Sequence, residues 1–300
     1  ANQLPKTIHK DEVSKREDYR SISTFTIDPA DAKDFDDALS FQKLKNGNTE
    51  IGVHIADVSH YINPTDVIDK EAIKRATSVY LVDRTIPMLP EVLSNNICSL
   101  RPHEESLCFS VIFEFDSDAN VKDYRFAKTV IYSDHRFSYE DAQEVIDTEK
   151  GLYAEEMKTM NLIASKLRKK KYENGAINFE TTEFRFTLDK NGKPIAVIPK
   201  VRKDAHKMIE EYMLLANKYV ARQLYVDNNK MPIPYRVHEE PSPEKLAEFA
   251  ETALNFGFRI DTSNYKQLAA SINSMVSKVQ GTLEGDILQP LAIRSMEKAY

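Results

Sequence analysis

The chain of 300 residues is long enough for one large domain or two small ones, and 41% hydrophobic with 29% charged residues is the composition of a folded protein. A net charge of −6 does not by itself indicate a nucleic-acid-binding protein, so any basic surface must be local. No stretch approaches the roughly 18 apolar residues of a membrane span, and the first residues lack the apolar segment of a signal peptide. Two cysteines, Cys98 and Cys108, fit buried free thiols in a reducing cytosol.

The first half of the chain is predicted to be rich in strands. Residues 1–22 are charged and polar and are interpreted as a lead-in segment to a domain over residues 23–300. Apolar runs separated by turn residues predict, in chain order, strand 24–27, strand 38–41, strand 50–55, helix 69–78, strand 106–115 and strand 121–132.

The second half of the chain becomes mainly helical. Ser138 and Asp141 have the spacing of a capping box at the start of a helix. The predicted elements are helix 138–147, helix 152–172, a hairpin of strands 176–188 and 193–201, helix 204–226, helix 243–256, helix 264–279 and helix 287–300. The proline-rich stretch 231–235 is too short for a domain linker. The sequence therefore predicts one α+β domain with a helical last third.

Five carboxylates lie within ten residues after the first predicted strand: Asp28, Asp31, Asp34, Asp36 and Asp37. Like charges this close repel one another unless water or a cation neutralises them, and Mg²⁺ prefers oxygen ligands. An EF-hand is a poor fit, because the glycine and the final glutamate of its loop are missing. From spacing alone, a solvated turn or helix cap remains an equal alternative to a metal site.

The segment from Thr26 to Leu39, TIDPADAKDFDDAL, closely resembles the signature of the RNase II/RNase R family of exoribonucleases, the RNB catalytic domain. Further blocks resemble the family in the same order, and they favour the RNase R branch. These blocks are 52–61, 77–90, 93–95, 98–102, 204–206, 209–211, 213–217 and 235–239. The resemblance implies an RNB-type α+β fold with a mixed sheet in the first half, surrounded by helices.

The resemblance also implies an activity. Enzymes of this family degrade RNA processively from the 3′ end and release 5′-mononucleotides by Mg²⁺-dependent hydrolysis. By resemblance, Asp28, Asp34 and Asp37 would bind Mg²⁺ or Mn²⁺, and Asp36 would lie at the reacting end of the substrate. Asp31 matches no role and is interpreted as solvated or structural.

Two tyrosines and two glutamates match family positions that contact the substrate. Tyr80 would stack on a base near the RNA 3′ end, although a core aromatic in a strand is the alternative. Tyr139 and one of Glu210 and Glu211 would recognise the ribose, whose 2′-hydroxyl both donates and accepts hydrogen bonds. Helix geometry leaves the choice open and slightly favours Glu210, because it shares a face with later residues of the helix.

Other polar residues of the matching blocks are less specific. Three arginines are candidate phosphate contacts, although each could equally be a surface or ion-pair arginine: Arg84, Arg101 and Arg236. His54, Asp57 and His60 have the appearance of a metal triad, but the family does not use them as ligands, and they are interpreted as structural.

The chain departs from the family at its ends. The serine–proline–isoleucine–arginine motif, whose arginine contacts the scissile phosphate, is not found, and neither are the S1 and cold-shock-like domains. We therefore expect a C-terminally truncated catalytic domain from a monomeric, cytoplasmic enzyme that binds the 3′ end of single-stranded RNA and has no membrane partner. The alternatives are an inactive RNA- or protein-binding fragment and an unrelated Mg²⁺ phosphohydrolase.

Overall fold

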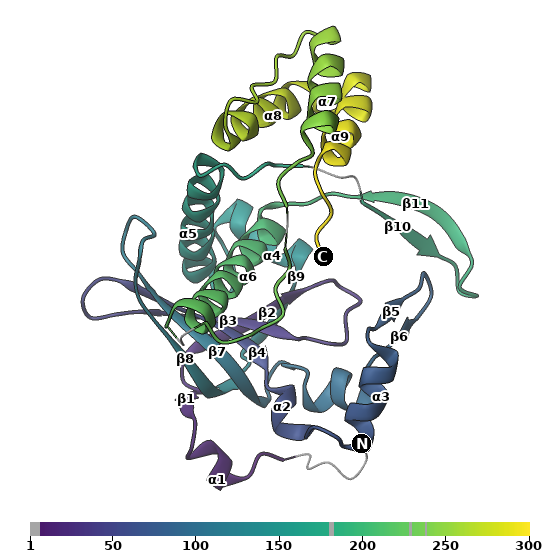
Figure 1. Cartoon of the computed structure of the whole chain (residues 1–300). Helices are drawn as coiled ribbons and strands as arrows, with labels where there is room; N and C mark the ends of the chain where they lie inside the picture. Colours follow the sequence, from purple (N-terminus) through teal and green to yellow (C-terminus); the bar gives the residue numbers. More distant parts are fainter. Residues whose placement is uncertain (1–6, 180–182, 228–229, 238) are drawn as a thin grey trace. The chain divides into compact units, whose positions relative to one another are not determined.

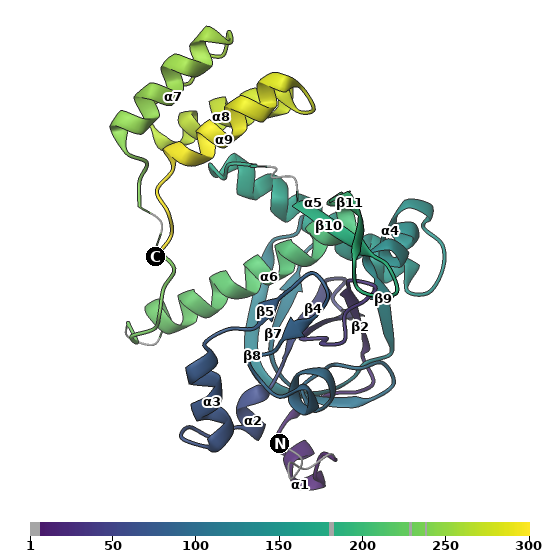
Figure 2. The same cartoon turned by 90° about the vertical axis from the view of Figure 1, so that its right-hand side faces the viewer.

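A computed structural model describes residues 7–179, 183–227, 230–237 and 239–300 (Figures 1 and 2). The chain forms two compact units. Unit 1 consists of residues 1–166 and 184–218, and unit 2 consists of residues 167–183 and 219–300. Within the described ranges, no helix is long and apolar enough to cross a membrane.

Unit 1 is built on a seven-stranded mixed sheet with the strand order β1-β8-β7-β4-β3-β2-β9 (Figure 1). The strands are Glu17–Tyr19 (β1), Ser23–Asp28 (β2), Asp37–Lys43 (β3), Thr49–Ala56 (β4), Glu105–Phe115 (β7), Val121–Tyr132 (β8) and His135–Ser138 (β9). The five inner strands pair antiparallel, and the outer strands β1 and β9 pair parallel with β8 and β2. The predicted α+β class and mixed sheet are confirmed.

The five inner strands agree with the sequence predictions within a few residues, because long runs of apolar residues mark them. The two outer strands were not predicted, since both are short and pair with distant segments. The strand predicted over 176–188 is wrong at its start, because residues 176–179 form no strand and residues 180–182 lie outside the described residues.

The segment before β2 contributes to the fold, although it was interpreted as a lead-in. Tyr19 of β1 is buried, and its hydroxyl donates a hydrogen bond to Glu50 at 2.9 Å. Arg16 is also buried, and its Nη2 lies 2.8 Å from Oδ2 of Asp57. A buried cation is stable only with such a partner, so this ion pair attaches the segment to the sheet and gives Asp57 a structural role.

The centre of the sheet is packed closely around Gly52 and His54 of β4. The ring nitrogens of His54 lie 2.7 Å from Ser110 Oγ and 2.8 Å from Ser40 Oγ. Burial lowers the pKa of His54 to about 3, so the ring is neutral. A Cβ at position 52 would lie 2.4 Å from Ser40 Oγ and 2.5 Å from His54 Nε2, so only glycine fits. His54 is therefore structural, as predicted.

Helices and two small hairpins complete unit 1. The helices are Lys10–Val13 (α1), Val58–Tyr61 (α2), Val67–Arg75 (α3), the π-helical turn Leu93–Ile97 (η1), Tyr139–Thr148 (α4), Ala154–Glu173 (α5) and Asp204–Arg222 (α6), of which α5 and α6 continue into unit 2. The hairpins are β5 (Val79–Tyr80) with β6 (Thr85–Ile86) and β10 (Glu183–Leu188) with β11 (Pro194–Lys200). The capping box of α4 is present between Ser138 and Asp141. Cys98 and Cys108 are buried free thiols, as predicted.

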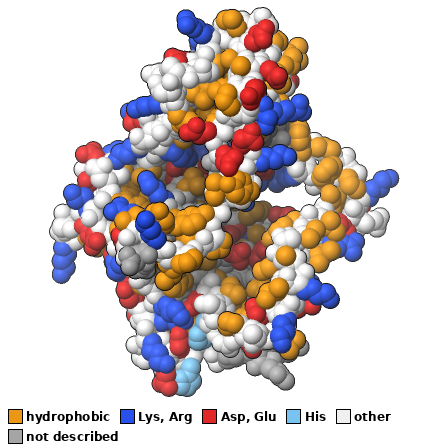
Figure 3. All heavy atoms as spheres, in the orientation of Figure 1, with side chains coloured by type: hydrophobic (Ala, Val, Ile, Leu, Met, Phe, Trp, Pro, Cys, Tyr) orange, Lys and Arg blue, Asp and Glu red, His pale blue; other side chains and the backbone are white. Residues whose placement is uncertain are grey.

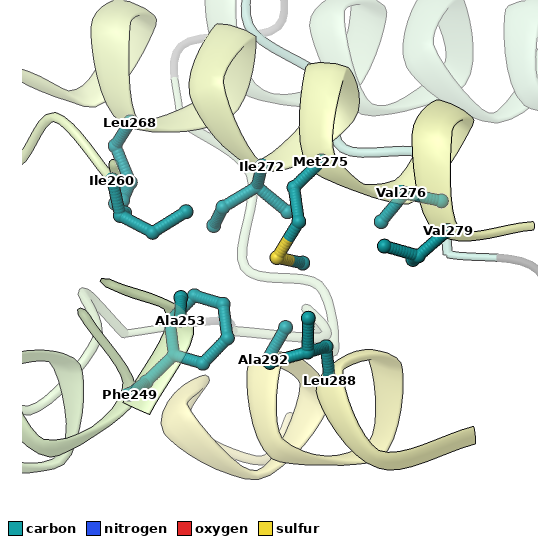
Figure 4. Packing of buried hydrophobic residues seen from close by; sticks show 10 residues of the cluster. All are labelled: Phe249, Ala253, Ile260, Leu268, Ile272, Met275, Val276, Val279, Leu288 and Ala292. Atoms are coloured by element: carbon teal, nitrogen blue, oxygen red, sulfur yellow. The ribbon is translucent and has the colours of Figure 1, made fainter. Parts of the chain in front are cut away.

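Unit 2 has a helical core of its own, which explains why the chain separates into two units. After the π-helical turn Gln223–Asp227 (η2), it contains Pro243–Asn255 (α7), Tyr265–Val279 (α8) and Leu283–Ser295 (α9). Figure 4 shows Phe249 and Ala253 of α7 and Leu288 of α9 pointing toward Ile272 and Met275 of α8. These five side chains are at most 3% exposed, so the hydrophobic effect stabilises this packing.

Candidate active site

The aspartate cluster lies on the loop between β2 and β3. Asp28 is the last residue of β2, and Asp37 is the first residue of β3. Because β2 and β3 are antiparallel neighbours, the two ends of the loop lie side by side at one edge of the sheet. Asp31 is exposed, as its interpretation as a solvated residue requires.

The buried hydroxyl of Ser99 holds this loop on both sides of Asp34. It accepts a hydrogen bond from the N–H of Phe35 at 3.0 Å and donates one to the carbonyl of Lys33 at 3.2 Å. The next residue, Leu100, donates its N–H to the carbonyl of Phe35 at 2.8 Å. The backbone around Asp34 is therefore fixed by a segment more than 60 residues away in sequence.

Arg136 of β9 supports the other side of the loop. It lies beside Thr26 in the parallel pairing of β2 and β9, and its Nη2 donates a hydrogen bond to the carbonyl of Pro29. Its guanidinium group lies 5.5 Å from the centre of the Phe35 ring, within the range of a cation–π contact. Its charge favours the ionised form of Asp28. Arg136 thus contacts both the start and the middle of the loop.

The carboxylates of the loop are difficult to ionise together. Burial, followed by the charges of Asp37 and Asp36, raises the pKa of Asp28 to about 7. Burial and the charge of Asp36 raise the pKa of Asp37 to about 6, and desolvation with the charge of Asp34 raises the pKa of Asp36. A nearby cation would relieve this repulsion.

The donor atoms of the loop suit a hard divalent cation, because they are all carboxylate oxygens. Asp28 Oδ2 is buried without a hydrogen-bond partner among the described residues, and a metal ion would satisfy such an atom. In the described part of the chain, however, no three acidic, histidine or cysteine side chains are grouped closely enough to hold a metal as they stand. The predicted ligand set Asp28, Asp34 and Asp37 therefore stays a prediction.

Tyr80 lies beside the loop on β5. Its side chain is 69% exposed, so the alternative of a core aromatic is wrong. Desolvation, followed by the charges of Asp34 and Asp36, raises the pKa of its hydroxyl, so the phenol is within electrostatic reach of both carboxylates. An exposed ring at this position is available to stack on a base.

Tyr139 is the first residue of α4, and its hydroxyl is within electrostatic reach of the two residues where the loop begins and ends. Burial, followed by the charges of Asp37 and Asp28, raises its pKa to about 12. Its ring stacks on His206 of α6, with ring centres 3.9 Å apart and planes 7° from parallel. The two predicted tyrosines therefore interact with different carboxylates of the loop.

The two glutamates of α6 have different surroundings. Glu211 is buried at 4% exposure, on the side of the helix that packs into the core. Glu210 is partly exposed and forms an ion pair with Arg202, whose charge in turn acts on Tyr139. The preference for Glu210 in ribose recognition stays a prediction.

The three candidate arginines have different surroundings. Arg84 is exposed and pairs with Asp83 at the turn between β5 and β6. Arg101 interacts with Glu104 and lines a cavity of about 380 Å³ beside η1. Arg236 belongs to unit 2. Their contacts with phosphate stay predictions.

The reasoning from sequence did not identify four residues that support the site: Ser99, Arg136, Arg202 and His206. Ser99 and His206 lie in blocks that resemble the family, and this was their only signal. The roles of Arg136 and Arg202 depend on which segments lie beside each other in the fold, and no local pattern records this.

The chain belongs to the RNB domain family, whose model matches residues 16–300. It is 36% identical over 305 aligned positions to ribonuclease R 1 of Lactococcus lactis and 39% identical over the same length to ribonuclease R of Thermotoga maritima. Each alignment covers 100% of this chain, but only 37% and 42% of those proteins. The resemblance inferred from the sequence blocks is confirmed.

A solved structure agrees with this assignment. Mycoplasma genitalium RNase R in complex with ribose-methylated single-stranded RNA superimposes with a TM-score of 0.89 at 29% identity. The match covers 100% of this chain and 47% of that one, so the chain spans less than half of its relative.

Proposed function

We propose that this chain is the catalytic part of an exoribonuclease that degrades RNA processively from the 3′ end and releases 5′-mononucleotides. The observation that carries the proposal is a loop of crowded carboxylates with Tyr80 and Tyr139 both within electrostatic reach of it. Membership of the RNB family and the ribonuclease names of its relatives support it. The RNA bound to Mycoplasma genitalium RNase R supports single-stranded RNA as the partner.

The residues of the loop have separate tasks in this proposal. Asp28, Asp34 and Asp37 would hold Mg²⁺ or Mn²⁺, which when bound supplies an activated water and stabilises the leaving oxygen. Asp36 is exposed and faces the reacting end of the RNA. Ser99 and Arg136 hold the backbone of the loop in place.

Substrate recognition is assigned to the residues around the loop. The exposed ring of Tyr80 would stack on a base near the 3′ end, which suits an enzyme without sequence preference. Tyr139 and Glu210 would contact the ribose 2′-hydroxyl and thereby select RNA over DNA. We further propose a monomeric enzyme of the cytoplasm.

The test compares Asp36→Asn with the exposed control Asp31→Asn on a 5′-labelled RNA in Mg²⁺ buffer. We expect Asp36→Asn to abolish mononucleotide release while RNA binding, measured by fluorescence anisotropy, is retained. Asp31→Asn should leave both unchanged. If the wild-type chain binds RNA but releases no mononucleotide, it is an RNA-binding fragment, and the catalytic proposal for this chain is wrong.

A further inference from the structure

The hairpin of β10 and β11 carries an unusual combination of side chains for an exposed element. Nearly all of its residues are exposed, including Phe184 at 60% and Phe186 at 46%. These two phenylalanines alternate with Arg185 along β10, so their rings lie on the same face of the strand. Ile195 and Val197 of β11 are also exposed, at 64% and 58%.

The hairpin also carries a net positive charge in an acidic protein. Residues 183–200 contain two acidic residues, Glu183 and Asp189, and four basic residues: Arg185, Lys190, Lys193 and Lys200. The whole chain has a net charge of −6, so this hairpin is a local basic element. Figures 1 and 3 show the hairpin at the right of the view, with hydrophobic side chains along it and lysine or arginine side chains near its outer end.

The hairpin lies next to the part of the site that holds Tyr80. A Cβ at Gly192, in the turn between β10 and β11, would lie 3.9 Å from the Cβ of Asp83. Asp83 belongs to the turn between β5 and β6, and Tyr80 is on β5. The basic hairpin therefore continues the surface that begins at the carboxylate loop.

We propose that the β10–β11 hairpin is a second contact surface for single-stranded RNA, which binds the part of the strand that has not yet reached the carboxylate loop. This inference rests on the proposed function. Lysine and arginine attract the phosphates, and the exposed phenylalanine rings stack on bases, which is the usual combination on surfaces that bind single strands. A protein partner fits less well, because lysine is depleted at the centres of protein interfaces.

The test measures RNA binding by fluorescence anisotropy in the Asp36→Asn background, so that the RNA stays intact. One variant combines R185Q, K190Q and K193Q. The control combines K45Q, K122Q and K150Q, which removes three exposed lysines elsewhere in unit 1 and changes the net charge equally. Circular dichroism confirms that each variant is folded, and a tetranucleotide serves as a short ligand that offers few phosphates to the hairpin.

We expect the hairpin variant to bind a long oligonucleotide at least tenfold more weakly than the control variant does. The two variants should bind the tetranucleotide with equal affinity. Its salt slope, dlogK/dlog[salt], should be about 2 smaller in magnitude, since each lost phosphate contact on a single strand removes roughly 0.7. Phe184→Ala with Phe186→Ala should weaken binding roughly tenfold without this change of slope. The charge-conserving variant R185K/K190R/K193R should behave like the parent chain.

Three other results would overturn parts of the reasoning separately. If the parent chain binds RNA and the hairpin variant binds equally well with the same salt slope, the hairpin proposal is wrong and the proposed function stands. If the parent chain binds no RNA, the proposed function itself fails. If binding is unchanged but the substitutions abolish dimers seen by analytical ultracentrifugation, the hairpin is a protein interface and not an RNA surface.

Discussion

The substitution Asp28→Asn tests the electrostatics of the carboxylate loop directly. Asp28 is buried, and its pKa is raised from 3.8 to about 7 in the folded chain. The folded chain thus holds the proton more tightly than the unfolded chain, and stability falls as the pH rises from 3.8 to about 7. Asparagine has nearly the same shape and cannot ionise, so it removes this cost.

The size of the effect follows from the shift of the pKa. At about 1.36 kcal/mol for each pKa unit, a shift of roughly three units costs about 4 kcal/mol at about pH 8 and about half of that at about pH 5. In metal-free buffer, Asp28→Asn should therefore be more stable than the wild type, and its advantage should grow by about 2 kcal/mol between about pH 5 and about pH 8. Exposed Asp31→Asn is the matched control and should change stability at neither pH.

Urea denaturation followed by circular dichroism at the two pH values, with EDTA present, measures this difference. A second experiment adds Mg²⁺ at about pH 8 and should stabilise the wild type but not Asp28→Asn. The reason is that a ligand that binds only the folded state raises the free energy of unfolding. The account of Asp28 as a carboxylate that needs a cation would be refuted by either of two results. One is a stability advantage of Asp28→Asn that is the same at both pH values, and the other is a lower stability of Asp28→Asn than of the wild type at about pH 8.

Three further predictions concern the surroundings of the loop. Ser99→Ala leaves the hydrogen-bond partners of a buried hydroxyl unsatisfied, at a cost of about 1–3 kcal/mol of folding stability. It should also lower kcat more than it raises KM. If Ser99 has an exclusively structural role, the substitution will lower only the fraction of folded protein. Glu210→Gln should reduce the ratio of activity on RNA to activity on DNA of the same sequence by about tenfold. Glu211→Gln should chiefly lower the melting temperature. The opposite pattern would assign the ribose contact to Glu211. Gly52→Ala should destabilise the chain by about 2 kcal/mol or more, because the alanine Cβ would overlap Ser40 Oγ. An unchanged midpoint of urea denaturation would contradict the packing described for β4.

The features that depend on neighbours along the chain could be predicted from the sequence. Long apolar runs gave the inner strands, Ser138 and Asp141 predicted the start of α4, and the spacing of the aspartates predicted a crowded carboxylate loop. The family resemblance added roles for Tyr80 and Tyr139, and the structure places both beside that loop. These properties are local, so they can be read without knowledge of the fold.

The distant residues that support the loop became apparent from the folded chain. The pairing of β9 with β2 brings Arg136 to the carbonyl of Pro29, and the segment after η1 brings Ser99 to the backbone around Asp34. The contact of His206 with Tyr139 depends on how α6 lies against α4. Such contacts join residues 60 or more positions apart. They form only when the whole unit packs together. No periodicity in the sequence records which strand lies beside which.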